Sequence, residues 1–134
     1  MPVLDTSVLV PAFDADHPRH AEARKLLAGP SLLHVSAGVT AELTTVIRRR
    51  ASDAGLPGAK VAREALARLE ALAGFRHAAS YDAEAVSQVY HTHASLSYVD
   101  ALGIVIALGI DDDLLTFDDA QAAAYRRERK KRER

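Results

Sequence analysis

The sequence predicts an α/β fold in which helices cover both faces of a short, mostly parallel sheet. Short apolar segments that suit strands alternate along the 134 residues with segments whose apolar residues recur at helical spacing. This alternation is typical of parallel sheets, and right-handed crossovers would place helices on both faces. The residues are 49% apolar but only 5% aromatic, so small aliphatic side chains must fill the interior. A chain of this length is expected to form one domain.

The predicted strands are short apolar runs that end at a polar residue or a turn signal. Four segments fit this description: Met1–Asp5, Leu32–Ser36, Phe75–Ala79 and Leu114–Phe117. The first strand is followed by a short apolar turn, Val8–Val10. We expect this turn to stop at Pro11, because proline disfavours a continuing helix.

The predicted helices combine apolar residues at a 3.6-residue period with start and stop signals. They run from about Pro18 to Ala28, from Val39 to Arg50, from Ala62 to Leu72, from Asp82 to His93, from Val99 to Ile110, and from Asp118 onward. A turn is predicted over Asp53–Gly58, and the third helix should end by Gly74. The segment Val99–Ile110 is apolar on all sides, which predicts a buried helix whose one charge is Asp100.

Composition excludes several classes of function. The sequence has no cysteine, which rules out disulfides, thiolate metal sites and thiol catalysis. Its six histidines show no convincing metal-ligand spacing, so no zinc site is expected. The N-terminus lacks the pattern of a signal peptide, and no run of about 18 apolar residues suggests a membrane span. We therefore expect a cytoplasmic protein.

The net charge of −1 conceals an uneven distribution of charge. The segment Arg126–Arg134 has seven basic and two acidic residues, whereas residues 1–125 have ten basic and sixteen acidic residues. We expect a folded domain over residues 1–125 and a basic tail over residues 126–134. The tail is either an RNA-attracting segment or a solvated helix end.

Four acids occupy positions that a solvated surface does not explain: Asp5, Glu42, Asp100 and Asp118. Asp5 ends the first strand, where it either faces the usual ligand crevice of a parallel sheet or caps the turn that follows. Glu42 is on the apolar side of its helix. It is either a functional carboxylate or a residue at the edge of the core whose charge reaches solvent. Asp100 completes a capping-box pattern with Ser97, and Asp118 can cap the last helix.

Considered together, the four acids favour a metal site. All four are predicted at one end of the sheet, where carboxylates repel each other unless a cation lies between them. Oxygen ligands without cysteine suit Mg²⁺ or Mn²⁺. Capping and metal binding are compatible, because one carboxylate oxygen can accept backbone N–H groups while the other faces the ion.

The segments that hold these acids resemble the motifs of the PIN-domain family. They are VLDTSVLV (Val3–Val10), AELTTVI (Ala41–Ile47), SYVDALGIVIA (Ser97–Ala107) and LLTFDDAQ (Leu114–Gln121). Their order and approximate spacing both fit, and the resemblance extends from Val3 to about Tyr125. Within the family, the sequence looks most similar to the VapC toxins of bacterial VapBC toxin–antitoxin pairs.

This resemblance implies a Rossmann-like α/β/α sandwich and a Mg²⁺- or Mn²⁺-dependent endoribonuclease. It also implies a homodimer that a VapB-type antitoxin inhibits. By motif position, the catalytic residues would be Asp5, Glu42, Asp100 and Asp118, with Asp5, Asp100 and Asp118 as metal ligands. The supporting residues would be Thr6, Ser7 and Thr116, with Asp119 as an outer acid or an exposed residue. The family often adds a strand after the last helix, and the basic tail here puts that fifth strand in question.

The resulting hypothesis is that one or two divalent ions activate a water, which attacks an RNA phosphodiester. Glu42 would hold a second ion or act as the general base, and both roles stay open. Arg48, Arg49 and Arg50 are candidate RNA-binding residues, although basic residues at a helix C-terminus also stabilise the helix dipole.

The sequence argues against one other class of enzyme and leaves one non-enzymatic function open. A phosphohydrolase with a nucleophilic aspartate needs the motif Asp-x-Asp, whose second aspartate is the acid/base. The triplet here is Asp5-Thr6-Ser7, so the second aspartate is absent and this class is excluded. The remaining alternative is a non-catalytic, metal-stabilised module that binds RNA or protein.

Overall fold

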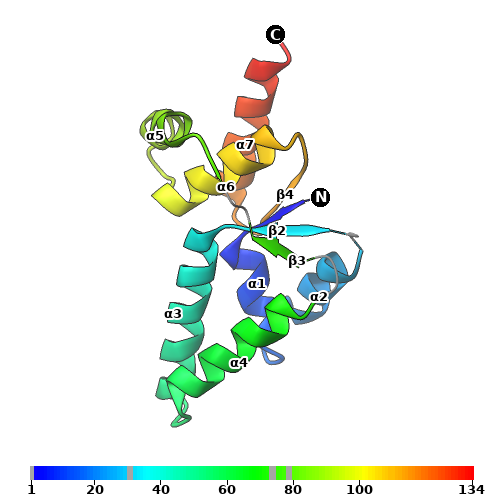
Figure 1. Cartoon of the computed structure of the whole chain (residues 1–134), viewed down its shortest axis with the longest axis vertical. Helices are drawn as coiled ribbons and strands as arrows, with labels where there is room; N and C mark the ends of the chain where they lie inside the picture. The colour runs from blue at the N-terminus through cyan, green and yellow to red at the C-terminus, as the bar shows by residue number, and fades with distance from the viewer. Residues whose placement is uncertain (1, 30–31, 73–74, 78–79) are drawn as a thin grey trace.

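The computed structural model describes residues 2–29, 32–72, 75–77 and 80–134, and it confirms the α/β prediction (Figure 1). The elements are β1 (Val3–Leu4), α1 (Thr6–Phe13), α2 (His20–Ala28), β2 (Leu33–Val35), α3 (Ala37–Asp53), α4 (Gly58–Glu70), β3 (Phe75–His77), α5 (Ala83–Thr92), α6 (Tyr98–Gly109), β4 (Leu114–Leu115) and α7 (Asp119–Arg132). Each predicted strand contains one of these strands. Met1, Gly74 and Ala78–Ala79, which also belong to the predictions, lie outside the described residues.

The four strands form one parallel sheet in the order β3-β2-β1-β4. Val3 in β1 pairs with His34 on one side and with Leu114 on the other. The carboxyl ends of all four strands therefore lie at the same edge of the sheet. Beyond the end of β1, the N–H of Asp5 donates to the carbonyl of Leu115 (3.0 Å), which extends the pairing with β4 to the acid.

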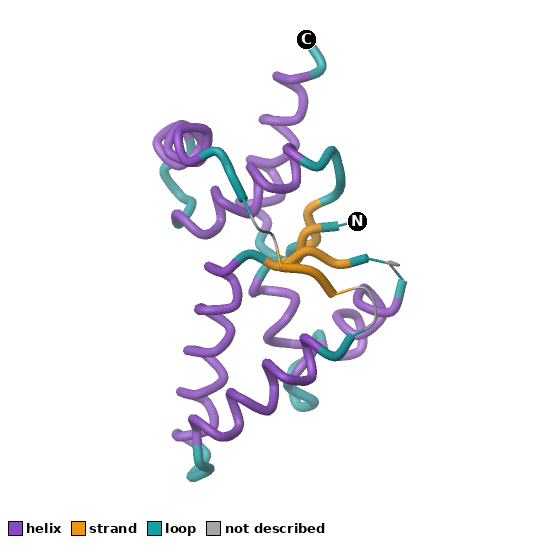
Figure 2. The backbone as a smooth tube through the Cα atoms, viewed as in Figure 1, coloured by secondary structure: helices purple, strands orange, loops and turns teal. Residues whose placement is uncertain are grey.

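Helices cover both faces of the sheet, as Figure 2 shows with the strands at the centre. In Figure 1, α1 to α4 lie below the sheet and α5 to α7 lie above it. Successive strand residues point to opposite faces, so Val3 packs with α5, α6 and α7, whereas Leu4 packs against α1 and α3. The predicted α/β/α sandwich is therefore correct.

Helix α6 is buried along most of its length, as its apolar sequence predicts. Ala101 to Ala107 are all buried, and Ser97 caps the helix. The capping box is complete: Ser97 Oγ accepts from the N–H of Asp100 (3.1 Å), and Asp100 Oδ2 accepts from the N–H of Ser97 (3.0 Å). Among the described residues, no helix has the length and apolar character needed to cross a membrane.

The prediction that the turn after β1 stops at Pro11 is wrong. Helix α1 continues through Pro11 to Phe13. Proline removes only its own N–H, and in so short a helix this costs a single bond to the carbonyl of Ser7. The buried side chains of Val8, Leu9 and Ala12 hold the helix against the core on both sides of the proline.

Candidate active site

Asp5 occupies the gap between β1 and α1, where it begins the helix. Its Oδ2 accepts from the N–H of Ser7 (3.0 Å) and from the hydroxyl of Thr116 (3.4 Å). Only 5% of the residue is exposed, which makes it one of the few buried polar residues of the described chain. Burying a carboxylate costs desolvation free energy, and two hydrogen bonds offset only part of that cost.

Glu42 reaches the same region from the second turn of α3. Its neighbours on the helix, Val39 and Leu43, are buried, and Glu42 is half-buried beside them. The hydroxyl of Thr6 donates to Glu42 Oε1 at 3.4 Å and so connects α3 to the start of α1. Burial raises the pKa of Glu42 above its ordinary value, and the charges of Asp5 and Asp100 raise it further.

Asp100 and Asp118 complete the group from the starts of α6 and α7. Burial raises the pKa of Asp100, and the charges of Asp5 and Asp118 raise it further, against the hydrogen bonds from Ser97. Asp118 is exposed, and its Oδ1 accepts from the N–H of Gln121 (2.9 Å) as the N-cap of α7. The structure thus brings all four predicted acids into one electrostatically coupled group.

Three hydroxyl side chains hold the acids in place. Ser7 Oγ and Thr116 Oγ1 lie 3.0 Å apart, and Thr116 Oγ1 also accepts from the N–H of Asp118 (3.0 Å). The N–H of Phe117 donates to Ser7 Oγ (2.9 Å). Together with the bond from Thr6 to Glu42, these contacts link the segments that follow β1 and β4 to α3. Thr6, Ser7 and Thr116 therefore each hydrogen-bond to Asp5 or Glu42, through a hydroxyl or, for Ser7, through its N–H.

Among the described residues, the four acids have no cationic side-chain partner. Within residues 2–29, 32–72, 75–77 and 80–134, the ion pairs of lysine, arginine and histidine all go to other acids. A coupled group of carboxylates without a positive side chain suits an oxygen-binding divalent cation. No three described His, Asp or Glu side chains are close enough to form a ready-made ligand cluster. Mg²⁺ is commonly bound through one or two carboxylates and several waters, so the donor set still fits that ion.

Comparison with known proteins agrees with the fold. A protein-family model described as PIN domain matches residues 3–127. The chain belongs to the PIN-domain family. This match covers all four acid-bearing segments, whereas no curated protein matches the chain.

A solved structure shows the same fold. This PIN domain is similar to the crystal structure of Mycobacterium tuberculosis VapC20, a toxin that cleaves the sarcin-ricin loop. The TM-score is 0.71 at 23% sequence identity, and the alignment covers 92% of this chain and 95% of that chain. At this identity the likeness establishes the architecture.

The other predicted residues lie outside the coupled group of acids. Asp119 is exposed as the first residue of α7, and its charge lies within electrostatic range of Arg19. Arg48 and Arg49 are exposed near the end of α3, roughly 10 Å along the helix from Glu42. Arg50 donates to Asp14 Oδ2 (2.9 Å).

Residues that the sequence analysis did not select also shape the site. Gln121 is fully buried, and its side-chain amide donates to the carbonyl of Asp100 (3.1 Å), which fixes the start of α7 against α6. A polar residue on the inward face of the last helix was the available signal. Arg19 lies with its guanidinium 3.5 Å from the centroid of the Phe117 ring, and no local sequence pattern joins these two residues.

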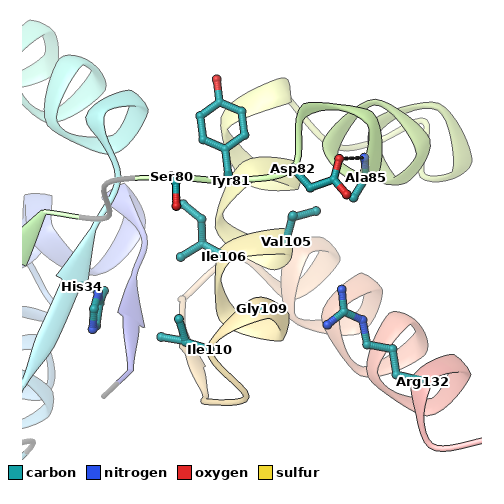
Figure 3. Close-up of a pocket in the computed structure, with 10 residues that line it drawn as sticks. All are labelled: His34, Ser80, Tyr81, Asp82, Ala85, Val105, Ile106, Gly109, Ile110 and Arg132. Atoms are coloured by element: carbon teal, nitrogen blue, oxygen red, sulfur yellow. Dashed lines mark hydrogen bonds between the residues drawn. The ribbon is translucent and has the colours of Figure 1, made fainter.

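A separate cavity of about 470 Å³ lies away from the acids, between β2, the segment before α5, and helices α6 and α7 (Figure 3). Ile106 and Ile110 contribute its apolar wall, with His34 and Arg132 on either side in the view. Asp82, which also lines the cavity, accepts from the N–H groups of Glu84 and Ala85 as the cap of α5. This cavity contains none of the four acids.

Proposed function

We propose that this PIN domain is a divalent-metal-dependent endoribonuclease. The observation that carries the proposal is the group of four coupled carboxylates, Asp5, Glu42, Asp100 and Asp118, with no cationic side-chain partner among the described residues. Its place at the carboxyl edge of a parallel sheet is where α/β folds bind ligands. Membership of the PIN-domain family supports a nuclease reaction.

The four acids would divide the work between binding and proton transfer. Asp5, Asp100 and Asp118 would hold Mg²⁺ or Mn²⁺, which supplies a Lewis acid and lowers the pKa of a bound water. Glu42 would accept the proton of the attacking water. Its raised pKa brings it closer to neutrality, where a general base is more effective. Thr6, which donates to Glu42, would orient that carboxylate.

We further propose that the protein acts as a VapC-type toxin on RNA in the cytoplasm, as a homodimer that a VapB-type antitoxin inhibits. The fold shared with VapC20 and the family membership support this role. An antitoxin of this kind would place a helix in a groove of the toxin. The intact chain should therefore arrest growth when expressed alone, and co-expression with its antitoxin should relieve the arrest.

The decisive experiment measures cleavage of structured RNA by antitoxin-free protein in Mg²⁺, in Mn²⁺ and in EDTA. Cleavage should require a divalent ion, and Asp100→Asn should reduce it by at least about a hundredfold. The matched control is Asp53→Asn, the same change at an exposed acid that ends α3. Equal cleavage by Asp100→Asn and the unchanged protein would refute the assignment.

The non-catalytic alternative predicts a different result. A metal-stabilised binding module would bind RNA or protein in the presence of Mg²⁺ but would leave every RNA intact. Binding without cleavage across several RNA pools, by protein that melts cooperatively, would therefore replace the nuclease proposal with a binding role.

A further inference from the structure

A second cavity adjoins the acids. It has a volume of about 410 Å³ and lies between α1, α3 and the segment before α2, with Phe117 closing one side. Thr6 and Ser7 line it, and the same two residues bond to Glu42 and Asp5. The cavity therefore adjoins the candidate active site through these two shared residues.

One wall of this cavity is a stacked pair of planar groups. The guanidinium of Arg19 lies 3.5 Å from the centroid of the Phe117 ring. Glu22 fixes the guanidinium with two bonds, at 2.9 and 3.0 Å from Nε and Nη2. The ring is anchored by the N–H of Phe117, which donates to Ser7 Oγ. The Arg19 side chain is nonetheless 44% exposed, so it remains accessible from the cavity.

The α3 side of the cavity provides a second cation. Arg50 lines the cavity and pairs with Asp14 at 2.9 Å, although its side chain is 53% exposed. Exposed ion pairs of this kind contribute about 0–1 kcal/mol, so a phosphate can replace Asp14 at little cost. Arg50 differs in this respect from Arg48 and Arg49, which do not line the cavity.

We infer that this cavity binds a single-stranded nucleotide next to the cleaved bond of an RNA substrate, with its base on the Arg19–Phe117 pair and its phosphate on Arg50. The inference rests on the proposed ribonuclease function. Single-stranded RNA is commonly held by stacking on aromatic rings and guanidinium planes. The acids repel phosphates, so a cationic wall beside them gives the backbone a place to bind. Apart from the imidazole of His17, the remaining lining is apolar or carries hydroxyl groups, including Val10 and Val46, which suits a base and its ribose.

The test measures the Kd of a labelled single-stranded RNA for the full-length Asp100→Asn protein in Mg²⁺, by fluorescence anisotropy. Arg19→Ala and Phe117→Leu, added separately, should each raise the Kd about tenfold, because one stacked base is lost. Arg24→Ala is the matched control, since Arg24 is an exposed arginine of α2, the helix that follows Arg19, and does not line the cavity. Its Kd should stay within about twofold of the parent value.

Two further variants separate stacking from charge. Arg19→Lys keeps the charge but not the plane, so it should bind as weakly as Arg19→Ala. Arg50→Ala should lower the slope of log Kd against log salt by about 0.7, the value for one contact to a single strand, whereas Phe117→Leu should leave the slope unchanged. Recovery of the parent Kd by Arg19→Lys would overturn the stacking role.

The outcomes separate this inference from the ribonuclease proposal. If the unchanged protein cleaves RNA with a divalent ion, but the Arg19, Phe117 and Arg50 variants keep the parent Kd, the cavity does not bind substrate and the nuclease role stands. If RNA binding depends on these residues but no RNA is cleaved, the subsite stands and the nuclease role falls. Thermal melting of each variant verifies that weaker binding does not reflect unfolding.

Discussion

Three of the four acids serve as helix caps while they share one site. Asp5 caps α1, Asp118 caps α7, and Asp100 forms half of the capping box of α6. In the part of the chain that the structure describes, each cap uses one carboxylate oxygen and leaves the other without a backbone donor. The caps fix the positions of the acids with short local bonds, so that the carboxylates stay within electrostatic range of one another despite their repulsion.

The repulsion should be measurable at Asp100. Burial, and then the charges of Asp5 and Asp118, hold its folded-state pKa above the unfolded value, so stability falls as pH rises from the ordinary carboxyl range through the raised pKa. Asp100→Asn removes the charge and keeps an acceptor for the N–H of Ser97. In EDTA at neutral pH it should raise the free energy of unfolding by up to about 1 kcal/mol after solvent screening.

Urea denaturation at several pH values tests this expectation. The gain from Asp100→Asn should shrink as pH falls below the raised pKa, because the carboxyl of the parent protein then becomes neutral as well. Asp53→Asn, at an exposed acid of α3, should show little change at any pH. A loss of stability in Asp100→Asn at neutral pH would mean that the carboxylate contributes more as a cap than its repulsion costs.

Sequence reasoning found the acids because each stands beside a recognisable strand end, cap or apolar helix face. Taken singly, each of Asp5, Asp100 and Asp118 can be interpreted as a cap, but one carboxylate can both cap a helix and face an ion, and the structure shows all three in capping contacts. Sequence reasoning could not find the contact between Arg19 and Phe117, because these residues meet only through the packing of α1 and α2 beside the end of β4. Such contacts leave no periodic trace in the sequence.

Among the helices, the pair α3 and α4 shows how one residue sets an element's position. Gly58 begins α4, and a Cβ at this position would lie 2.4 Å from Ser52 Oγ and 2.6 Å from the carbonyl oxygen of Arg48. The backbone oxygen cannot move without distorting α3. Only glycine therefore allows this close approach at the turn.

Gly58→Ala should lower the free energy of unfolding by about 1–3 kcal/mol, as overpacking usually does. Gly109→Ala is the matched control, because Gly109 ends α6 and a Cβ there meets no atom within 4 Å. The control should be neutral or slightly stabilising, since alanine is the better helix former. Denaturant midpoints of the two variants give the comparison, and equal midpoints would show that the turn after α3 relaxes freely.

The elements were largely predictable, and their ends were not. Strand and helix types follow from apolar periodicity, but Pro11 lies inside α1, and α7 extends through most of the basic tail to Arg132. Tertiary contacts explain how far α7 extends along the tail. Arg132 donates to the carbonyl of Leu108 (2.8 Å), and Glu128 pairs with His93 at 2.8 Å, so the tail is held against α6 and the end of α5.

At the scale of the whole molecule, folding creates the site. The four acids come from residues 5, 42, 100 and 118, so only the folded chain brings their charges together. A divalent cation that binds this group binds the folded state and not the unfolded one. By mass action, such a ligand must raise the stability of the whole domain.

Adding Mg²⁺ or Mn²⁺ to protein freed of metal by EDTA should therefore raise the melting temperature. The corresponding gain in the free energy of unfolding is about 2.7 kcal/mol when the free ion reaches a hundred times its Kd. Asp5→Asn and Asp100→Asn should each abolish most of this gain, whereas Asp53→Asn should keep it, because Asp53 lies at the far end of α3. Differential scanning fluorimetry across a metal titration provides the measurement. If Asp100→Asn gained as much melting temperature as the unchanged protein, the cation would bind elsewhere on the acid-rich residues 1–125. The four carboxylates would then need another explanation.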